Sequence, residues 1–346
     1  MLALLNEEQE MLRDLARQVA ASVAVGHPGD LATVERAKGW AALADAGLLG
    51  LRVRGPDGAP QASAVEVALV AEALGAALAP LPYVGTVVAL EALARAGAPA
   101  AWIDEIAAGT ARYGLLLTAD LSRLARADDS SAVAFDVDDA AWALALTGTA
   151  DPPTLARVGL DHGFGAATSA DLTRALVRGD GGAVAAEDAG VELTGPSHQA
   201  WLALALVVAA ADLVGVMSSA LARAVEYSKE RVQYGVKIGS FQAIQHLCAD
   251  ALVQVEAAGA TTRYAAWAVD ALDPAEALLA ARTAKAAASE MARPVTETVM
   301  QVFGGIGQTW EHGAHLHTRR ALVDRELLGN EGEQLLRIAD ARLSPT

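Results

Sequence analysis

The sequence predicts a mainly α-helical protein in which a small β unit separates two helical regions. Alanine and leucine, both good helix formers, dominate a chain of 346 residues that is 53% hydrophobic. After residue 196, long stretches run almost without helix breakers. Between residues 114 and 196, short apolar runs alternate with clusters of Asp, Gly and Pro, a pattern typical of strands and turns. We therefore expect a helical domain (1–113), a reduced middle β domain (114–196) and a C-terminal helical bundle (197–346).

Helices in the N-terminal domain are indicated by capping residues and apolar periodicity. Asn6 is a candidate N-cap, and Gln9, three residues on, completes a capping box. Further helices are expected over 34–46, 62–77 and 86–96, and a short helical turn is expected to begin at Asp104. In the middle domain we expect strands over 113–118, 132–137 and 141–146.

The C-terminal region is predicted to form a four-helix bundle with an extra tail. Helices are expected over 199–232, 241–271, 274–302 and 312–328, and the tail helix over 331–343. Pro294 is expected to kink the third helix, and the glycines at 304, 305 and 307 to end it.

Composition and charge exclude several classes of protein. A net charge of −16 argues against a nucleic-acid partner, because no basic stripe is present to contact phosphates. Cys248 is the sole cysteine, so no intrachain disulfide can form and a cytoplasmic location fits. The longest apolar run, 200–211, is shorter than the ~18 residues that a membrane span needs. We expect a buried core helix there, and a salt-bridged core acid at Asp212, which ends the run.

Two segments contain candidate binding residues. Arg231 ends one predicted helix shortly before another begins, and a guanidinium beside a helix N-terminus is a good anion site. A helical hairpin with surface charges is the alternative interpretation. Gln301 precedes Gly304 and Gly305, which would let a ligand approach the backbone closely. We expect no metal site at His312, His315 and His317, because no other type of ligand lies nearby.

Taken together, these segments resemble a known family. RVQYGVKIGSFQAIQH resembles the segment of acyl-CoA dehydrogenases that joins two bundle helices, and QVFGGIGQTWEHGAHLHTRRA resembles that family's later FAD-binding segment. Their spacing also matches, and WAALADAGLLGL and EEQEMLRDLARQ are similar to the family's N-terminal domain. The resemblance covers 197–328 closely and 1–110 loosely. It implies an acyl-CoA dehydrogenase-like fold, with an N-terminal helical domain, a β domain and a C-terminal four-helix bundle.

The resemblance also implies an activity, a cofactor and a set of binding residues. Family members remove the α and β hydrogens of an acyl-CoA thioester; a glutamate takes the proton and FAD takes the hydride. Their subunits pair so that one chain's bundle completes the neighbour's FAD site. The residues of this chain implied to contact FAD from the diphosphate to the adenosine side are Arg231, Gln233, Tyr234, Phe241, Gln242, Gln301, Gly304 and Gly305.

The sequence departs from the family where the flavin ring and the catalytic base are held. The middle domain lacks the family's T-E-P-x-A-G-S-D-like loop and its W-I-T/S-like strand; residues 117–120 are the nearest equivalent. One family position for the base falls on Ala205, and the other on Leu328 or Asn330. None of these side chains can abstract a proton. Glu331 is adjacent, and a small gap would make it the base.

We therefore expect an FAD-containing acyl-CoA dehydrogenase-like subunit that works with a full-length partner supplying the flavin-ring site and the base. One alternative is a self-sufficient homo-oligomer, such as a dimer of dimers, with Glu331 as base. The other is a non-catalytic scaffold that has lost FAD. The substrate class would be an acyl-CoA or another acyl thioester.

Overall fold

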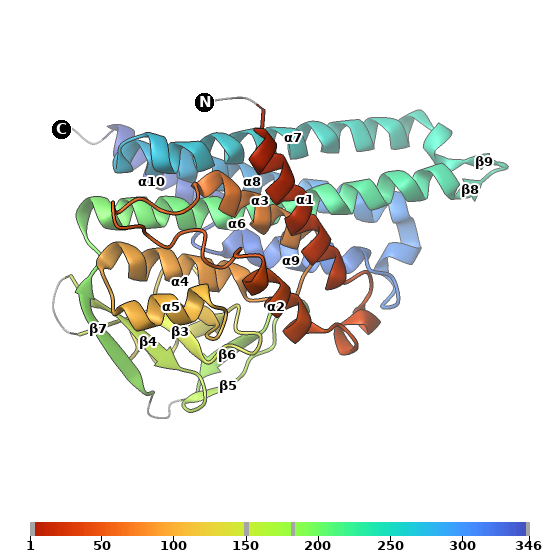
Figure 1. Cartoon of the computed structure of the whole chain (residues 1–346). Helices are drawn as coiled ribbons and strands as arrows, with labels where there is room; N and C mark the ends of the chain where they lie inside the picture. Colours follow the sequence, from red (N-terminus) through yellow and green to blue (C-terminus); the bar gives the residue numbers. More distant parts are fainter. Residues whose placement is uncertain (1–3, 149–151, 181–183, 344–346) are drawn as a thin grey trace.

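The computed structural model describes residues 4–148, 152–180 and 184–343 (Figure 1). Its N-terminal region contains α1 (Glu7–Ser22), the short 3-10 helix η1 (Pro28–Ala32), α2 (Arg36–Asp45), α3 (Ala64–Ala76), α4 (Tyr83–Ala96) and α5 (Ala100–Ala107). The predicted capping box is confirmed. Asn6 Oδ1 accepts a hydrogen bond from the Gln9 N–H at 2.8 Å, and Gln9 Oε1 accepts one from the Asn6 N–H at 3.2 Å.

Three predicted helix starts come three or four residues too late, since the helices expected from residues 86 and 199 begin at Tyr83 and Gly195. The last helix of the N-terminal region begins at Ala100, not at Asp104, and Pro99 is its N-cap. A proline suits the start of a helix, because its φ is already fixed and its missing N–H would have no partner in the first turn.

Within the described residues, the middle region forms a seven-stranded sheet. The strands are β1 (Tyr113–Leu117), β2 (Val133–Phe135), β3 (Trp142–Thr147), β4 (Thr154–Gly159), β5 (Phe164–Ala166), β6 (Leu176–Gly179) and β7 (Ala186–Glu192). Their order is β5-β6-β2-β1-β3-β4-β7, and β1–β3 is the parallel pair among antiparallel ones. The three strands expected from sequence are the central β2, β1 and β3. The Thr86 hydroxyl on α4 donates to the Tyr113 carbonyl and accepts from its N–H, each at 3.0 Å, which fixes the sheet against α4.

The C-terminal region is the predicted bundle. It comprises α6 (Gly195–Glu230), α7 (Gln242–Ala271), α8 (Pro274–Phe303) and α9 (Ala314–Glu326), followed by α10 (Glu331–Leu343). Between α6 and α7 lie the two-stranded hairpin β8 (Val232–Gln233) and β9 (Val236–Lys237) and the 3-10 turn η2 (Ile238–Ser240). A second 3-10 turn, η3 (Gly304–Gln308), ends α8 at the predicted glycines, and Pro294 lies inside α8, as the predicted helix bounds placed it.

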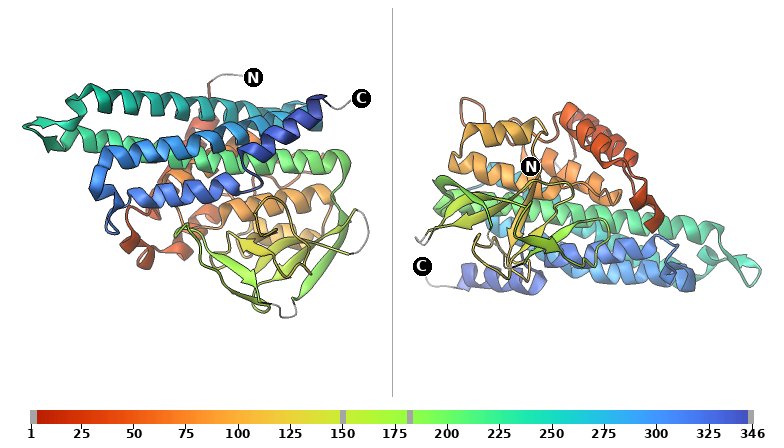
Figure 2. Two further views of the ribbon diagram at one scale, coloured as in Figure 1. Left: turned by 180° about the vertical axis from the view of Figure 1, so that it is seen from behind. Right: turned by 90° about the horizontal axis from the view of Figure 1, so that it is seen from below.

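The central helix of the bundle is α6. By length and composition it is apolar enough to cross a membrane, but 94% of its most apolar window is buried inside the protein. It packs against α3, α4, α7, α8 and α9. The apolar run at 200–211 is therefore a core helix, as expected. Figures 1 and 2 show α6 running from the sheet at one end of the molecule to the projecting β8–β9 hairpin at the other.

The crossing of α3 and α6 depends on two glycines. A Cβ added at Gly215 would lie 2.0 Å from the Glu72 carbonyl oxygen, and one added at Gly75 would lie 2.2 Å from the Asp212 carbonyl oxygen. Both obstacles are backbone atoms of a packed helix, which cannot move aside as a flexible side chain can. The absence of side chains at these positions therefore sets how closely the N-terminal region approaches the bundle.

We expect Gly215→Ala to destabilise the protein by roughly 1–3 kcal/mol, the usual cost of overpacking a core. Gly259→Ala is the matched control, because Gly259 also lies inside a long helix but the atoms nearest to an added Cβ there belong to the flexible Arg263 guanidinium. There the better helix propensity of alanine should leave stability unchanged or raise it by up to about 1 kcal/mol. Urea unfolding curves of both variants measure the difference. Equal midpoints for the two variants would contradict this account of the crossing.

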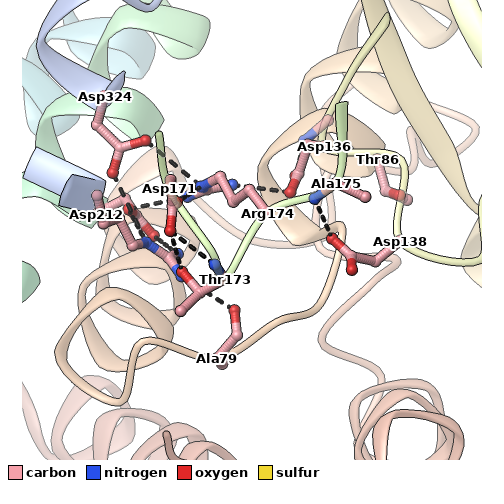
Figure 3. Close-up of polar contacts among 12 residues, drawn as sticks. Ala79, Thr86, Asp136, Asp138, Asp171, Thr173, Arg174, Ala175, Asp212 and Asp324 are labelled. Atoms are coloured by element: carbon pink, nitrogen blue, oxygen red, sulfur yellow. Dashed lines mark hydrogen bonds and ion pairs between the residues drawn. The ribbon is translucent and has the colours of Figure 1, made fainter. Parts of the chain in front are cut away.

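A fully buried ion-pair cluster holds the sheet region against the bundle (Figure 3). Arg174, in the loop between β5 and β6, contacts Asp136 at 2.8 Å and Asp212 of α6 at 2.9 Å. Arg320 of α9 forms a bidentate ion pair with Asp212, with N–O distances of 2.7 and 3.2 Å. The prediction that Asp212 is a salt-bridged core acid is confirmed. This cluster connects α6, α9 and the sheet region.

The acids of this cluster titrate in opposite directions. Burial acts to raise the pKa of Asp212, but the charges of Arg174 and Arg320 outweigh it and leave that pKa below its ordinary value. Asp324 of α9 lies farther from both arginines, at 3.4 and 3.7 Å. Burial and the neighbouring Asp212 charge raise the pKa of Asp324 well above the usual range. The shorter contacts of Asp212 with both arginines and the burial of Asp324 therefore move the pKa values of the two acids apart.

Candidate functional site

The predicted diphosphate-contacting residues lie on a hairpin that projects beyond the end of the bundle (Figure 1). Arg231 follows the last residue of α6, is exposed, and forms no ion pair within the described part of the chain. Tyr234 and Gly235 form the two-residue turn, with φ of 53° and 79°, and the Tyr234 side chain is 94% exposed. Both φ values are positive, as a type I′ hairpin turn requires.

The N-terminus of α7 lies beside this hairpin. The Ile238 N–H donates to the Arg231 carbonyl at 2.8 Å, and the Phe241 N–H donates to the Ile238 carbonyl at 3.1 Å. Phe241 is the N-cap residue and provides no side-chain cap, so the first N–H groups of α7, beginning at Gln242, have no capping partner. A free guanidinium beside uncapped helix N–H groups suits an anion such as a diphosphate.

The second predicted segment reaches the same end of the bundle. The Tyr227 ring, one turn before Arg231, packs on the Phe303 ring with a centroid distance of 4.9 Å. Gly304 follows directly with φ +64°, and a Cβ at Gly304 or Gly305 would meet nothing within 4 Å. Gln301 is exposed on the last turn of α8. The eight residues implied to bind FAD are thus on neighbouring elements at one end of the bundle.

Large apolar side chains are exposed around these residues. Among the described residues of this end, those with exposed fractions of 37–94% are Val232, Tyr234, Val236, Phe241, Ile306 and Trp310. Monomeric proteins rarely leave such a group of large side chains in water unless it meets a partner. This end of the bundle therefore has the character of a binding surface.

At the opposite end, a cleft of about 910 Å³ separates the sheet region from the bundle. Its lining comes from the loop after β1, from β3 and β4, and from the starts of α6, α8 and α10. The residues that shape its wall include Arg123, Leu124, Trp201, Arg282, Leu328 and Arg337. A helix of 36 residues is about 54 Å long, so α6 holds this cleft and the Arg231 hairpin far apart. Within one chain they do not form a single site.

None of the positions considered for a catalytic base presents a basic group to the cleft. Ala205 is fully buried in the core. Leu328 lines the cleft and is 3% exposed. Asn330 is not among the residues that line the cleft, and its amide donates to the Glu326 carboxylate at 2.9 Å. Glu331 is in a two-pronged ion pair with Arg325, in which the Nε contact measures 2.9 Å, and it is not among the residues that shape the cleft. Although burial opposes the shift, the hydrogen bonds from Arg325 lower the pKa of Glu331 and make it a weaker base.

The loop that carries Leu328 is held from both sides. On one side, the buried Lys285 ammonium donates to the Ser289 hydroxyl and to the carbonyls of Arg325 and Gly329, at 2.7–3.1 Å. Burial lowers the pKa of Lys285 to about 7. On the other side, the Leu328 N–H donates to the Leu121 carbonyl at 2.8 Å, and both leucines have positive φ, of 57° and 60°. Backbone strain of this kind persists only where the surroundings enforce it.

Sequence reasoning did not identify the contact between residues 121 and 328, or the role of Lys285. Nothing in an isolated leucine or lysine signals them, because the contacts join positions far apart in the chain. Arg174 was missed for the same reason, since a charge in a polar loop is normally solvated. Among the described residues, no three His, Cys, Asp or Glu side chains gather as metal ligands.

Comparisons with known proteins identify the family. Residues 6–110 match the model of the acyl-CoA dehydrogenase N-terminal domain, and residues 200–343 match that of the acyl-CoA dehydrogenase C-terminal domain. Acyl-CoA dehydrogenase IpdE2 of Mycobacterium tuberculosis is 32% identical over 341 residues, 96% of each chain. Acyl-CoA dehydrogenase FadE34 of the same organism is 42% identical over 135 residues, which span 39% of this chain and 19% of that longer protein. The chain belongs to the acyl-CoA dehydrogenase family, whose members are FAD-dependent oxidoreductases.

Solved structures confirm the fold. The Tcur3481-Tcur3483 steroid ACAD, in its G363A variant, superposes with a TM-score of 0.82 at 27% identity and 97% coverage of both chains. The ChsE4-ChsE5 complex from Mycobacterium tuberculosis superposes with a TM-score of 0.79 at 25% identity and full coverage of both chains. The predicted acyl-CoA dehydrogenase-like fold, with its β domain between two helical regions, is therefore correct. The domain boundaries at 113 and 196 stay predictions.

Proposed function

We propose that this chain is the accessory subunit of a heteromeric acyl-CoA dehydrogenase. A full-length partner holds the flavin ring and supplies the base, and this chain contributes Arg231, Gln301 and their neighbours to the adenosine and diphosphate half of that FAD site. FAD, when bound, accepts the hydride from the β-carbon of the acyl thioester. Two similar structures are described as two-component assemblies, the Tcur3481-Tcur3483 steroid ACAD and the ChsE4-ChsE5 complex, which supports a partner of this kind.

The observation that carries the proposal is the contact between Leu121 and Leu328. In the reaction, the base takes a proton from the face of the substrate opposite the flavin, so the loop at the base position must offer a proton acceptor to the substrate. Here that loop brings Leu328 to the cleft and is held against the loop after β1 by the backbone hydrogen bond of 2.8 Å. The cleft of this chain therefore has no proton acceptor at Leu328, which supports a base supplied by a partner.

The end of the bundle that carries the β8–β9 hairpin, in contrast, fits the adenosine and diphosphate half of FAD. Arg231 has an unpaired guanidinium, α7 has uncapped N–H groups, and Gly304 and Gly305 leave open space beside the backbone. Because α6 separates the two ends by about 54 Å, these groups can serve an FAD only on another subunit. A scaffold that had lost FAD would have no need of this arrangement.

We expect that the chain purified alone shows no bleaching of added FAD with any acyl-CoA. The panel should include straight-chain and steroid side-chain thioesters, and stopped-flow absorbance of the flavin is the measurement. The physical reason is that Leu328 has no basic group and Glu331 is engaged by Arg325. The chain co-expressed with a full-length family member encoded beside it should give a yellow complex whose flavin bleaches, and Glu331→Gln in that complex should bleach at the same rate.

Two results would overturn the proposal. If the lone chain bleaches and Glu331→Gln abolishes the bleaching, the chain is a self-sufficient enzyme with Glu331 as base. If no candidate partner yields a flavin-containing complex, the chain is a non-catalytic scaffold that has lost FAD.

A further inference from the structure

A buried lysine ties the turn between α9 and α10 to α8. Lys285 is fully buried, and within the described residues it forms no ion pair. An ammonium without a carboxylate partner is unusual in a protein core, because burial disfavours the charge. Its three N–H groups donate to the Ser289 hydroxyl at 2.7 Å, to the Arg325 carbonyl at 2.8 Å and to the Gly329 carbonyl at 3.1 Å. One charge therefore holds both ends of the turn.

The turn itself, formed by residues 327–330 and called the Leu328 turn below, is strained. Leu328 has φ +57° and Gly329 has φ +91°. Positive φ at a leucine costs free energy and persists only where the surroundings enforce it. The Leu328 carbonyl accepts from the Gln334 side-chain amide at 2.7 Å, and the Leu328 N–H donates to the Leu121 carbonyl at 2.8 Å. A weaker hold on the turn should therefore loosen its contact with the Leu121 loop.

Loss of a proton from Lys285 would weaken this hold. A neutral amine has two N–H groups and a lone pair, so it can still donate to the two carbonyls while accepting from the Ser289 hydroxyl. That hydroxyl also donates to the Arg325 carbonyl at 3.3 Å, a contact that it would give up. The bonds from Lys285 to the carbonyls would lose their charge assistance, which makes a hydrogen bond roughly twice as strong. The ammonium thus fixes the turn more firmly than the amine does.

The proton of Lys285 is lost near neutral pH. Burial lowers the pKa of Lys285 to about 7, although neighbouring carboxylates act to raise it. The charged groups around it are Asp324, Arg325 and Glu326 of α9, Glu331 of α10, and Asp212 of α6, which lies next to Asp324. Glu326 and Glu331 are both paired with Arg325, whose charge itself lowers the pKa of Lys285.

We propose that Lys285 is a pH-sensitive conformational switch, which as the ammonium holds the Leu328 turn against the Leu121 loop and as the amine lets the turn move away. Leu328 lines the cleft between the sheet region and the bundle, so movement of the turn changes the contact between these two regions. The switch does not depend on the proposed function, because it concerns a turn of this chain whether the base comes from a partner or not.

Nuclear magnetic resonance of lysine labelled with 13C at Cε follows the proton directly. The chain has four lysines, and Lys38, Lys229 and Lys237 are exposed. Replacing these three by arginine leaves Lys285 as the one labelled residue and changes nothing in the core. Its Cε signal in the full chain should titrate with a midpoint near pH 7. A midpoint in the ordinary lysine range, about pH 10.4, would overturn the proposal.

Hydrogen exchange of the same variant measures the turn. After correction for the intrinsic exchange rate, protection of the peptide that contains residues 327–330 should be roughly tenfold lower at pH 8.5 than at pH 6, with the midpoint of the Cε titration. A peptide from 203–213, in the core of α6, is the internal control and should keep its protection. Equal protection of the turn at both pH values, or a midpoint more than about one unit from that of Lys285, would show that Lys285 does not control the turn.

Discussion

Replacing Arg174 by alanine is expected to lower the free energy of unfolding by about 3–5 kcal/mol. The guanidinium is 1% exposed and contacts Asp136 at 2.8 Å and Asp212 at 2.9 Å, with Asp324 at 3.4 Å. Its removal leaves buried carboxylates without their counter-charge, and breaking a buried ion pair from one side costs about this much. Chemical unfolding followed by circular dichroism measures the loss.

Arg178→Ala is the control for this substitution. Arg178 lies four residues further along on β6 and is exposed, so its removal should change stability by no more than about 0.5 kcal/mol. Because the cluster joins α6, α9 and the sheet region, Arg174→Ala should also expose the sheet region to proteolysis before the bundle. A variant as stable as the parent would mean that the cluster is held by Arg320 alone.

The acids of the same cluster should respond to mutation in opposite ways. A carboxyl whose pKa is raised by folding, as that of Asp324 is, lowers stability as the pH rises above its ordinary value, because the folded state keeps a proton that the unfolded state releases. Asp324→Asn should remove this cost and leave stability at neutral pH unchanged or higher. The pKa of Asp212 is lowered, so its contribution is present at neutral pH, and Asp212→Asn should be clearly destabilising.

The sequence predicts the helices better than the sites because helix signals are local. The capping residues Asn6 and Gln9 and the long apolar periodicity after residue 196 each depend on neighbours along the chain, and the structure confirms them. The resemblance carried by RVQYG and QVFGGIG placed Arg231 and Gln301 on segments that meet at one end of the bundle. The distance between the Arg231 hairpin and the cleft depends on the course of α6 through the core. No local sequence pattern indicates which end of this helix the sheet region packs against.

What the sequence did not indicate depends on contacts between distant segments. Arg282 and Arg337 lie on different helices, and each resembles an ordinary solvated arginine until α8 and α10 are packed together. The contact between the loops of Leu121 and Leu328 is similar, because a backbone carbonyl and a backbone N–H carry no sequence signature. The lack of a glutamate at the second base position, Leu328 or Asn330, was visible in the sequence. That Leu328 lines the cleft, and that its loop contacts the loop of Leu121, required the structure.

Replacing Arg231 by alanine is expected to weaken FAD binding, so that the active complex is purified with little flavin. A hydrogen bond to a charged group contributes about 1.5–3 kcal/mol, which corresponds to a loss of about 10- to 150-fold in FAD affinity. Arg231 is suited to this role because it is exposed, unpaired and joined through Ile238 to the start of α7. The measurement is the flavin content of the purified complex by absorbance, followed by titration with FAD and an assay of acyl-CoA dehydrogenation at saturating FAD.

The control is Lys229→Ala. Lys229 is an exposed cation two residues earlier, and Glu226 at 2.6 Å already neutralises it, so this variant should keep its flavin. Arg231→Lys should restore part of the FAD affinity, because an ammonium keeps the charge but cannot bind phosphate in the bidentate way that a guanidinium does. Activity of Arg231→Ala should return when FAD is added in excess, since the residue binds the cofactor and takes no part in proton or hydride transfer. Flavin content equal to that of the parent would show that the hairpin end of this chain does not reach the partner's cofactor, and the accessory-subunit proposal would then lose its physical basis.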